Sequence, residues 1–111
     1  MTFSVRLVAS AKGDVDDIFG WLLARSAKGA SNWYSSLSSR LERLSDDASG
    51  CAVAREAHRL KRDLRETYFK TRYGNRYRLV FTIVDSEVRI LRVRALGQKL
   101  LRAQELPTDD E

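Results

Sequence analysis

Residues 76–94 read RYRLVFTIVDSEVRILRVR, and this stretch decides the fold class. Two runs rich in β-branched and aromatic residues, 76–84 and 87–94, are separated only by Asp85 and Ser86. Two small polar residues between two such runs predict a β-hairpin with a two-residue turn. The C-terminal half of the chain is therefore expected to be built on antiparallel strands.

The hairpin predicts which side chains share a face, because pairing Val84 with Glu87 sets the register of both strands. One face would be almost wholly apolar, so we expect helices to cover it. The other face would carry cations at both ends, so we expect a ligand to meet it. The pairs predicted for the first face are Ile83 with Val88, Phe81 with Ile90 and Leu79 with Arg92, and those for the second are Thr82 with Arg89, Val80 with Leu91 and Arg78 with Val93.

The sequence before the hairpin predicts a further strand. Residues 64–73 are rich in Thr and aromatic side chains, and Gly74 and Asn75 supply a turn before the hairpin begins. Three consecutive antiparallel strands form a meander. Residues 51–63 show no apolar stripe, so only a short helical turn is expected there.

The N-terminal half predicts one strand and two helices. Residues 3–9 alternate apolar and polar side chains, as a half-buried strand does. Asp14 can cap a helix that runs to Arg25. A second helix is expected over 28–46, since Ala30, Trp33, Tyr34, Leu37, Leu41 and Leu44 recur at helical spacing, and we expect Trp33 and Tyr34 to be core residues.

These elements predict an α+β domain: an N-terminal strand, a two-helix hairpin and a three-stranded antiparallel meander, forming one small sheet with helices on one face. The length of 111 residues suits a single domain. We expect that domain over residues 1–106 and an acidic tail over 107–111.

Positive charge is concentrated in one part of the chain. The whole sequence has a net charge of +5, whereas residues 55–102 hold fourteen Lys and Arg against five acidic residues, a net charge of +9. Such a segment attracts a polyanion or an acidic protein, although a solvated basic face is the plain alternative. No apolar run is long enough to span a bilayer, so we expect a cytoplasmic protein without a membrane partner.

The chain offers little for metal or redox chemistry. Cys51 is the single cysteine, and His58 is the single histidine. Neither forms a spacing typical of a zinc or disulfide motif. We therefore expect no metal and no cofactor, with Cys51 in a structural role.

The strings Leu64-Arg65-Glu66, Tyr77-Arg78-Leu79-Val80-Phe81 and Val88-Arg89-Ile90-Leu91-Arg92-Val93-Arg94 occur in the order seen in one family. From Leu64 to Gly97 the chain resembles the RelE/ParE superfamily of toxins, and especially the plasmid stabilisation toxins of type II toxin–antitoxin systems. The resemblance covers nearly the whole chain. It implies a compact toxin that a cognate acidic antitoxin wraps and inactivates, with a small acidic open reading frame expected beside this one.

The superfamily divides by target. One branch cleaves messenger RNA in the ribosomal A site, and the ParE type blocks DNA gyrase. Cleavage would need groups that deprotonate the 2′-hydroxyl, neutralise the phosphate and protonate the leaving oxygen, and basic side chains can do this without a metal. The resemblance carries these roles to Arg78 in the Tyr-Arg motif and Lys99 after Gly97, and more loosely to Lys70 and Arg72.

Other residues separate the two branches. After Gly97 the chain has no tyrosine or histidine, so the usual acid or base of the cleaving branch is missing. This favours inhibition by binding to gyrase over cleavage of RNA, and leaves a binding-only or inactive toxin open. Contacts with the target or antitoxin are expected from Arg65, Arg76, Arg89, Arg92 and Arg94.

A plain nucleic-acid-binding module is the competing interpretation. Aromatic residues lie among the cations of the predicted sheet, and such rings can stack on bases. Alternation along the strands, however, should turn some of these rings into the core. The residues concerned are Tyr68, Phe69, Tyr73 and Tyr77.

Overall fold

The computed structural model describes residues 2–71 and 74–107, and within these residues one five-stranded sheet has the strand order β1-β5-β4-β3-β2. The strands are β1 (Ser4–Leu7), β2 (Ala52–Val53), β3 (Arg65–Lys70), β4 (Arg76–Val84) and β5 (Glu87–Ala95). The helices are α1 (Ala9–Leu23), α2 (Ala27–Asp47) and α3 (Ala57–Leu60), with 3-10 turns η1 (Ala48–Gly50) and η2 (Ala103–Glu105). The predicted α+β class and element order are confirmed.

The N-terminal strand lies at the edge of the sheet and pairs with the last strand. β1 runs parallel to β5, with Val5 beside Val88 and Leu7 beside Ile90. The three strands of the predicted meander, β3, β4 and β5, are antiparallel. The opposite edge gains the short strand β2, which the sequence did not indicate.

Helix α2 matches the predicted helix closely, and Ser26 caps it by accepting a 3.0 Å hydrogen bond from the Gly29 amide. Trp33 is buried, as expected, but Tyr34 is 53% exposed, so its assignment to the core was wrong. Successive residues of a helix point about 100° apart, and the buried stripe holds only one of the two rings. Tyr34 instead makes an edge-to-face contact with Phe19 of α1.

Helix α1 begins at Ala9, five residues before the predicted cap at Asp14, and ends at Leu23 rather than Arg25. Asp14 lies inside the helix because its carboxylate has another partner. It accepts two 2.8 Å hydrogen bonds from Arg92 and one of 2.9 Å from the Val93 amide. The Val93 amide lies beyond the last β1–β5 pair, so the aspartate satisfies a donor that β1 does not reach.

A β-bulge alters the predicted register of the hairpin. The pairs nearest the turn, including Phe81 with Ile90, are as predicted, but the register shifts between Val80 and Phe81. Leu91 is the extra residue on β5, and it is fully buried. The predicted partners beyond that point were therefore wrong: Leu79 faces Val93, Val80 faces Arg92 and Arg78 faces Arg94.

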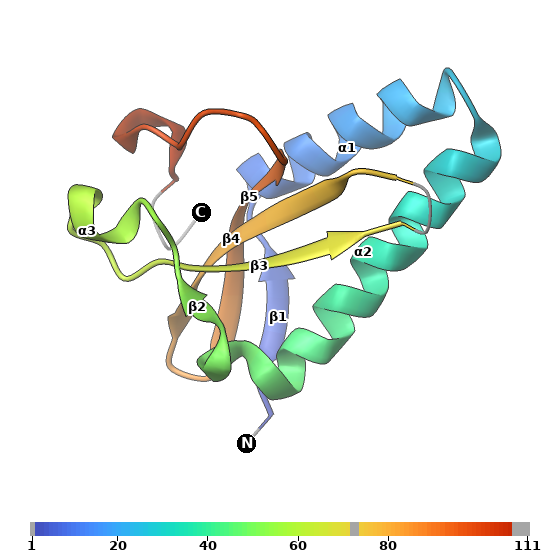
Figure 1. Cartoon of the computed structure of the whole chain (residues 1–111). Helices are drawn as coiled ribbons and strands as arrows, with labels where there is room; N and C mark the ends of the chain where they lie inside the picture. Colours follow the sequence, from blue (N-terminus) through green and yellow to red (C-terminus); the bar gives the residue numbers. More distant parts are fainter. Residues whose placement is uncertain (1, 72–73, 108–111) are drawn as a thin grey trace.

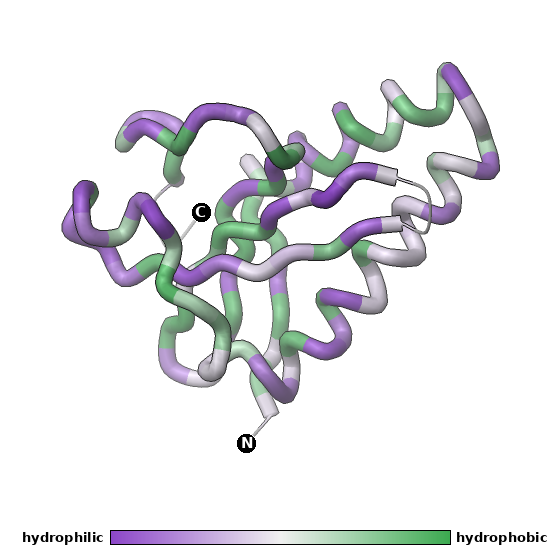
Figure 2. The backbone as a smooth tube through the Cα atoms, in the orientation of Figure 1, coloured by the Kyte–Doolittle hydropathy of each residue, from purple (hydrophilic) through white to green (hydrophobic). Residues whose placement is uncertain are grey.

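Both faces of the sheet are covered. Figure 1 shows the α1–α2 hairpin along one side of the sheet, as predicted, and α3 with the C-terminal segment on the other. In Figure 2 the hydrophobic stretches of the central strands lie between these layers, while α3 is largely hydrophilic. Leu101 and Leu106 of the C-terminal segment belong to the core. The face expected to meet a ligand is thus partly closed by the chain itself.

The end of the described chain continues this covering layer. Pro107 is buried, and its carbonyl accepts a 3.0 Å hydrogen bond from Arg62. From residue 108 onward, the expected acidic tail lies outside the described residues. Within the part of the chain that the structure describes, no helix combines the length and apolar character needed to cross a membrane.

Replacing Asp14 by Ala should lower the free energy of unfolding by about 2–3 kcal/mol, because Arg92 and the Val93 amide lose a largely buried, charged acceptor. Urea denaturation followed by circular dichroism measures this change. Asp16→Asn, an exposed change in the same helix, is the matched control and should stay within about 0.5 kcal/mol of the wild type. Equal midpoints for both variants would refute the role given to Asp14.

Candidate functional site

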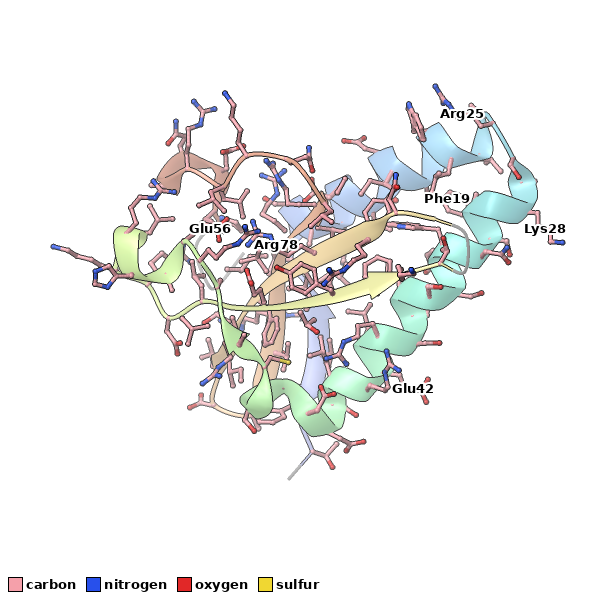
Figure 3. The ribbon with its side chains drawn as sticks, viewed as in Figure 1. Phe19, Arg25, Lys28, Glu42, Glu56 and Arg78 are labelled. Atoms are coloured by element: carbon pink, nitrogen blue, oxygen red, sulfur yellow. The ribbon has the colours of Figure 1, made fainter. Side chains whose placement is uncertain are left out.

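Arg78, the best-placed candidate from the sequence, lies between two carboxylates. Its side chain is 4% exposed. The two terminal nitrogens bind Glu56 in a bidentate manner, at 2.6 and 2.8 Å, and one of them also donates to Glu66 at 3.0 Å. Figure 3 shows Arg78 reaching from β4 toward Glu56. Planar, charge-assisted pairs of this kind are the strongest hydrogen bonds that side chains form.

The carboxylates connect Arg78 to the segments that cover the sheet. Glu56, which is fully buried, also accepts a 2.9 Å hydrogen bond from the Leu101 amide. Arg59 of α3 donates to the Leu101 carbonyl at 2.7 Å. Glu66 of β3 accepts a 3.0 Å hydrogen bond from the Tyr68 hydroxyl. One arginine therefore joins β4, β3, the start of α3 and the C-terminal segment.

The protonation states of this cluster follow from its contacts. Burial alone raises the pKa of Glu56, but the hydrogen bonds from Arg78 and the Leu101 amide, together with the charge of Arg78, outweigh burial and lower the pKa to about 2. The same bonds to Glu56 raise the pKa of Arg78. Burial and the bond to Glu66 raise the pKa of Tyr68. Arg78 and Glu56 are therefore both charged at neutral pH.

Arg78 does point away from the helical hairpin, as predicted, but it is buried and does not lie on an open face that a ligand could meet. Residues 54–64 and the C-terminal segment cover this part of the sheet, and neither covering segment has a hydrophobic period that would have predicted it. The bulge also places Arg78 beside Arg94 rather than Val93. Its terminal nitrogens are occupied within the chain.

The cations expected to meet a target or antitoxin are largely paired internally. Arg92 binds Asp14 and the Glu105 carbonyl, and Arg94 binds Glu105 and the Lys99 carbonyl. Arg65 donates to the carbonyls of Ser49 and Cys51, and Arg89 donates to Glu87 at 2.6 Å. The high net charge of this segment thus overstates the charge available to a partner.

Three of the candidate cations remain exposed. Lys70 and Arg76 face each other at the ends of β3 and β4, and the guanidinium of Arg76 lies 4.5 Å from the centre of the Tyr68 ring. Lys99 is exposed in the segment after β5. Arg72 lies outside the described residues. The remaining candidates are therefore scattered over one end of the sheet rather than gathered around Arg78.

Cys51 lies at the junction after η1. Its sulfur accepts a 3.7 Å contact from Arg40 and donates to the Asp47 carbonyl at 3.6 Å. Burial raises the pKa of the Cys51 thiol, which reduces the thiolate needed for nucleophilic attack. Among the described residues, no three His, Cys, Asp or Glu side chains come together in a way that could hold a metal ion.

One feature of the surface was missed by sequence reasoning. A groove of about 800 Å³ lies between α2 and the ends of β3 and β4, and its lining includes Trp21, Trp33 and Tyr77. The pairing of Phe69 with Tyr77 across β3 and β4 could have indicated an aromatic cluster. The sequence did not specify the turn between β3 and β4, so the pairing of Phe69 with Tyr77 could not be predicted from it.

The strand order and the helical hairpin define a small α+β domain, and comparisons with known proteins identify its family. Residues 5–99 match the family described as the ParE toxin of the type II toxin–antitoxin system, parDE. The chain therefore belongs to the ParE toxin family. No curated protein sequence matches it.

A solved structure shares the fold of this chain. A chain of the chromosomal ParDE toxin–antitoxin system from P. aeruginosa aligns with a TM-score of 0.64 at 15% identity, covering 86% of this chain and 98% of the other. A chain of the RelBE2 toxin–antitoxin complex from Mycobacterium tuberculosis aligns over 86% of this chain and 99% of the other, at 24% identity and a TM-score of 0.44. The match to the ParE toxin family confirms the RelE/ParE resemblance drawn from the sequence.

The buried cluster predicts an acid-sensitive stability. Because the pKa of Glu56 falls from 4.5 to about 2 on folding, its stabilisation is complete above about pH 4.5 and is lost as the pH falls toward 2. The shift corresponds to about 3 kcal/mol. Urea midpoints measured from pH 7 to pH 2 should fall steeply for the wild type.

Glu56→Gln should be less stable at pH 7 and should show a flatter pH profile, since the amide does not titrate. Glu42→Gln, an exposed change on α2, is the control and should keep the wild-type profile. A Glu56→Gln profile as steep as the wild type would mean that other carboxylates cause the acid sensitivity.

Proposed function

We propose that this toxin arrests growth by binding DNA gyrase, and that it does not cut RNA. The family description names the ParE toxin of the parDE system. The resemblance drawn from the sequence implies gyrase as the target of the ParE type. Membership in a type II toxin family also implies a neutralising antitoxin. The choice between gyrase and ribosome rests on the chemistry of the described residues.

The observation that carries the proposal is the pairing of Arg78. In the cleaving branch, the arginine of the Tyr-Arg motif would have to meet a phosphate. Here its terminal nitrogens already contact Glu56 and Glu66, and its side chain is 4% exposed. A phosphate entering this cluster would meet two carboxylates, and their negative charge opposes its approach. This arrangement disfavours a phosphate site at Arg78.

The remaining candidates do not replace the missing groups. Lys70 and Lys99 are exposed and lie apart from the Arg78 cluster, so they supply positive charge to the surface and not a shared site. After Gly97 the sequence has no tyrosine or histidine. Inhibition by binding needs only a complementary surface, which a small basic domain provides.

The test is a supercoiling assay with purified gyrase and relaxed plasmid. We expect an excess of toxin to abolish supercoiling, while messenger RNA on programmed ribosomes stays intact in a parallel reaction. Active supercoiling together with toxin-dependent cleavage of the message would contradict the proposal and favour the ribosomal target.

A control separates gyrase binding from DNA coating. Topoisomerase I relaxing the same plasmid should be unaffected by the toxin at the same salt concentration. Equal inhibition of both enzymes would indicate a basic nucleic-acid-binding module, whose effect should fall steeply as salt rises.

A further inference from the structure

Trp21, near the C-terminal end of α1, is the largest exposed apolar side chain among the described residues. It is 57% exposed, and the guanidinium of Arg25 stacks 3.6 Å from the centre of its ring. Arg25 also donates a 2.9 Å hydrogen bond to the Trp21 carbonyl, so the cation is held against the ring. Figure 3 shows Arg25 at the tip of the helical hairpin. Tryptophan and arginine are enriched at the energetic centres of protein interfaces, so this pair has the composition of a contact surface.

A hollow of about 460 Å³ lies beside Trp21, where α1 faces the ends of β4 and β5. Its walls include Asp17 and Ile18 of α1, Tyr77 of β4 and Ala95 of β5. Concave sites of this size hold drug-sized molecules, so the hollow has room for one indole ring. A protruding ring and a hollow that can receive one therefore lie side by side on the same surface.

Two opposite charges on this surface have no ionic partner within the part of the chain that the structure describes. Asp17 is exposed and lines the hollow, and its carboxylate forms no hydrogen bond or ion pair with another described residue. Arg25 likewise forms no ion pair among those residues. The other charged side chains of the hollow, Asp14, Arg92 and Arg94, are paired inside the chain. Asp17 and Arg25 are therefore available to a partner.

The spacing of these side chains makes the surface complementary to itself. Asp17, Trp21 and Arg25 are four residues apart, so they follow one side of the helix, with about 6 Å along its axis between neighbours. A two-fold axis near Trp21 would set two copies of α1 antiparallel. Each Asp17 would then face the Arg25 of the other copy, and each Trp21 would lie over the other copy's hollow. Such reciprocal contacts are what an isologous dimer interface requires.

We propose that the toxin binds a second copy of itself through this surface, named here the α1 face and made of Asp17, Ile18, Trp21, Arg25 and Ala95. Two Asp17–Arg25 ion pairs would flank two packed indole rings. The proposal goes beyond gyrase inhibition and does not depend on it. A nucleic acid fits the α1 face less well, because the Asp17 carboxylate repels phosphate.

The net charge of the chain does not prevent this association. The charge of +5 repels a second copy at long range, but at physiological ionic strength charges more than about 8 Å apart are largely screened. The α1 face itself contributes one free anion and one free cation. Contact between two such faces therefore brings together opposite charges, although the whole molecules carry the same sign.

Sedimentation of the purified toxin at physiological salt tests the proposal. Between about 1 µM and about 500 µM, the wild type should change from monomer to dimer. Trp21→Ala should weaken dimerisation at least about tenfold, because it removes the ring that fills the opposite hollow. A wild-type protein that stays monomeric over the whole range would overturn the proposal, as would a Trp21→Ala variant that dimerises like the wild type.

A mixture of two charge variants tests whether the ion pairs form between copies. Asp17→Arg leaves only cations at positions 17 and 25, and Arg25→Glu leaves only anions, so each variant alone should dimerise at least about tenfold more weakly than the wild type. In an equimolar mixture, position 17 of each variant meets an opposite charge at position 25 of the other. The mixed dimer should therefore form with an affinity within about threefold of the wild-type dimer.

Glu42→Arg is the matched control, because it makes the same change in charge at an exposed position of α2 far from the tip of the hairpin (Figure 3). It should dimerise like the wild type. Circular dichroism checks the fold of each variant. If Arg25→Glu does not fold, Asp17→Asn replaces it, and Asp17→Arg should then dimerise more weakly than Asp17→Asn.

The outcomes of these measurements are independent of the proposed target. Folded single variants that dimerise like the wild type, or a mixture of folded variants that does not associate, would overturn the assignment of the α1 face. Because sedimentation uses the toxin alone, its result holds whatever the supercoiling assay gives. A dimeric toxin that leaves gyrase active would contradict only the gyrase proposal.

Discussion

The ion pair between Arg78 and Glu56 holds together the face of the sheet that the helical hairpin leaves open. Glu56 has no solvent exposure, and its oxygens meet Arg78 and the Leu101 amide, so the carboxylate is fully satisfied by groups from two other segments. Breaking such a buried pair by removing one partner leaves an uncompensated charge, which is far more costly than losing a surface contact. The positions of α3 and of the C-terminal segment both depend on this pair.

Ion pairs within the chain also reduce the positive charge that the surface presents. A sequence whose middle and later parts are strongly basic suggests an open basic face, yet Asp14, Glu56, Glu66 and Glu105 neutralise the arginines that sit on the sheet. Among the described residues, exposed cations remain at several places, including Arg43 on α2, Lys70 at the end of β3 and Lys99 after β5. The charge that the surface offers to a partner is therefore smaller than the total charge of the chain indicates.

The helices and strands that could be predicted are those whose sequence pattern lies within the element itself or in the turn beside it. Hydrophobic periodicity identified α2, and the Asp85-Ser86 turn identified the hairpin. The predictions that failed concern residues whose partners are distant in sequence. Asp14 was assigned to a helix cap because its true partner, Arg92, is far away in sequence. Glu56 lies in a stretch without hydrophobic periodicity, so its role was not predicted. A bulge leaves no sequence signature here, so the register beyond Phe81 and the surroundings of Arg78 could not be predicted.

If Arg78 serves the fold, the variant Arg78→Ala should lose stability and should lose growth arrest only in proportion, and both can be measured in parallel. The free energy of unfolding in urea should fall by about 3–5 kcal/mol, with growth arrest declining only as far as the folded fraction declines. An Arg78→Ala variant with the wild-type urea midpoint that no longer arrests growth would show instead that Arg78 is a contact residue.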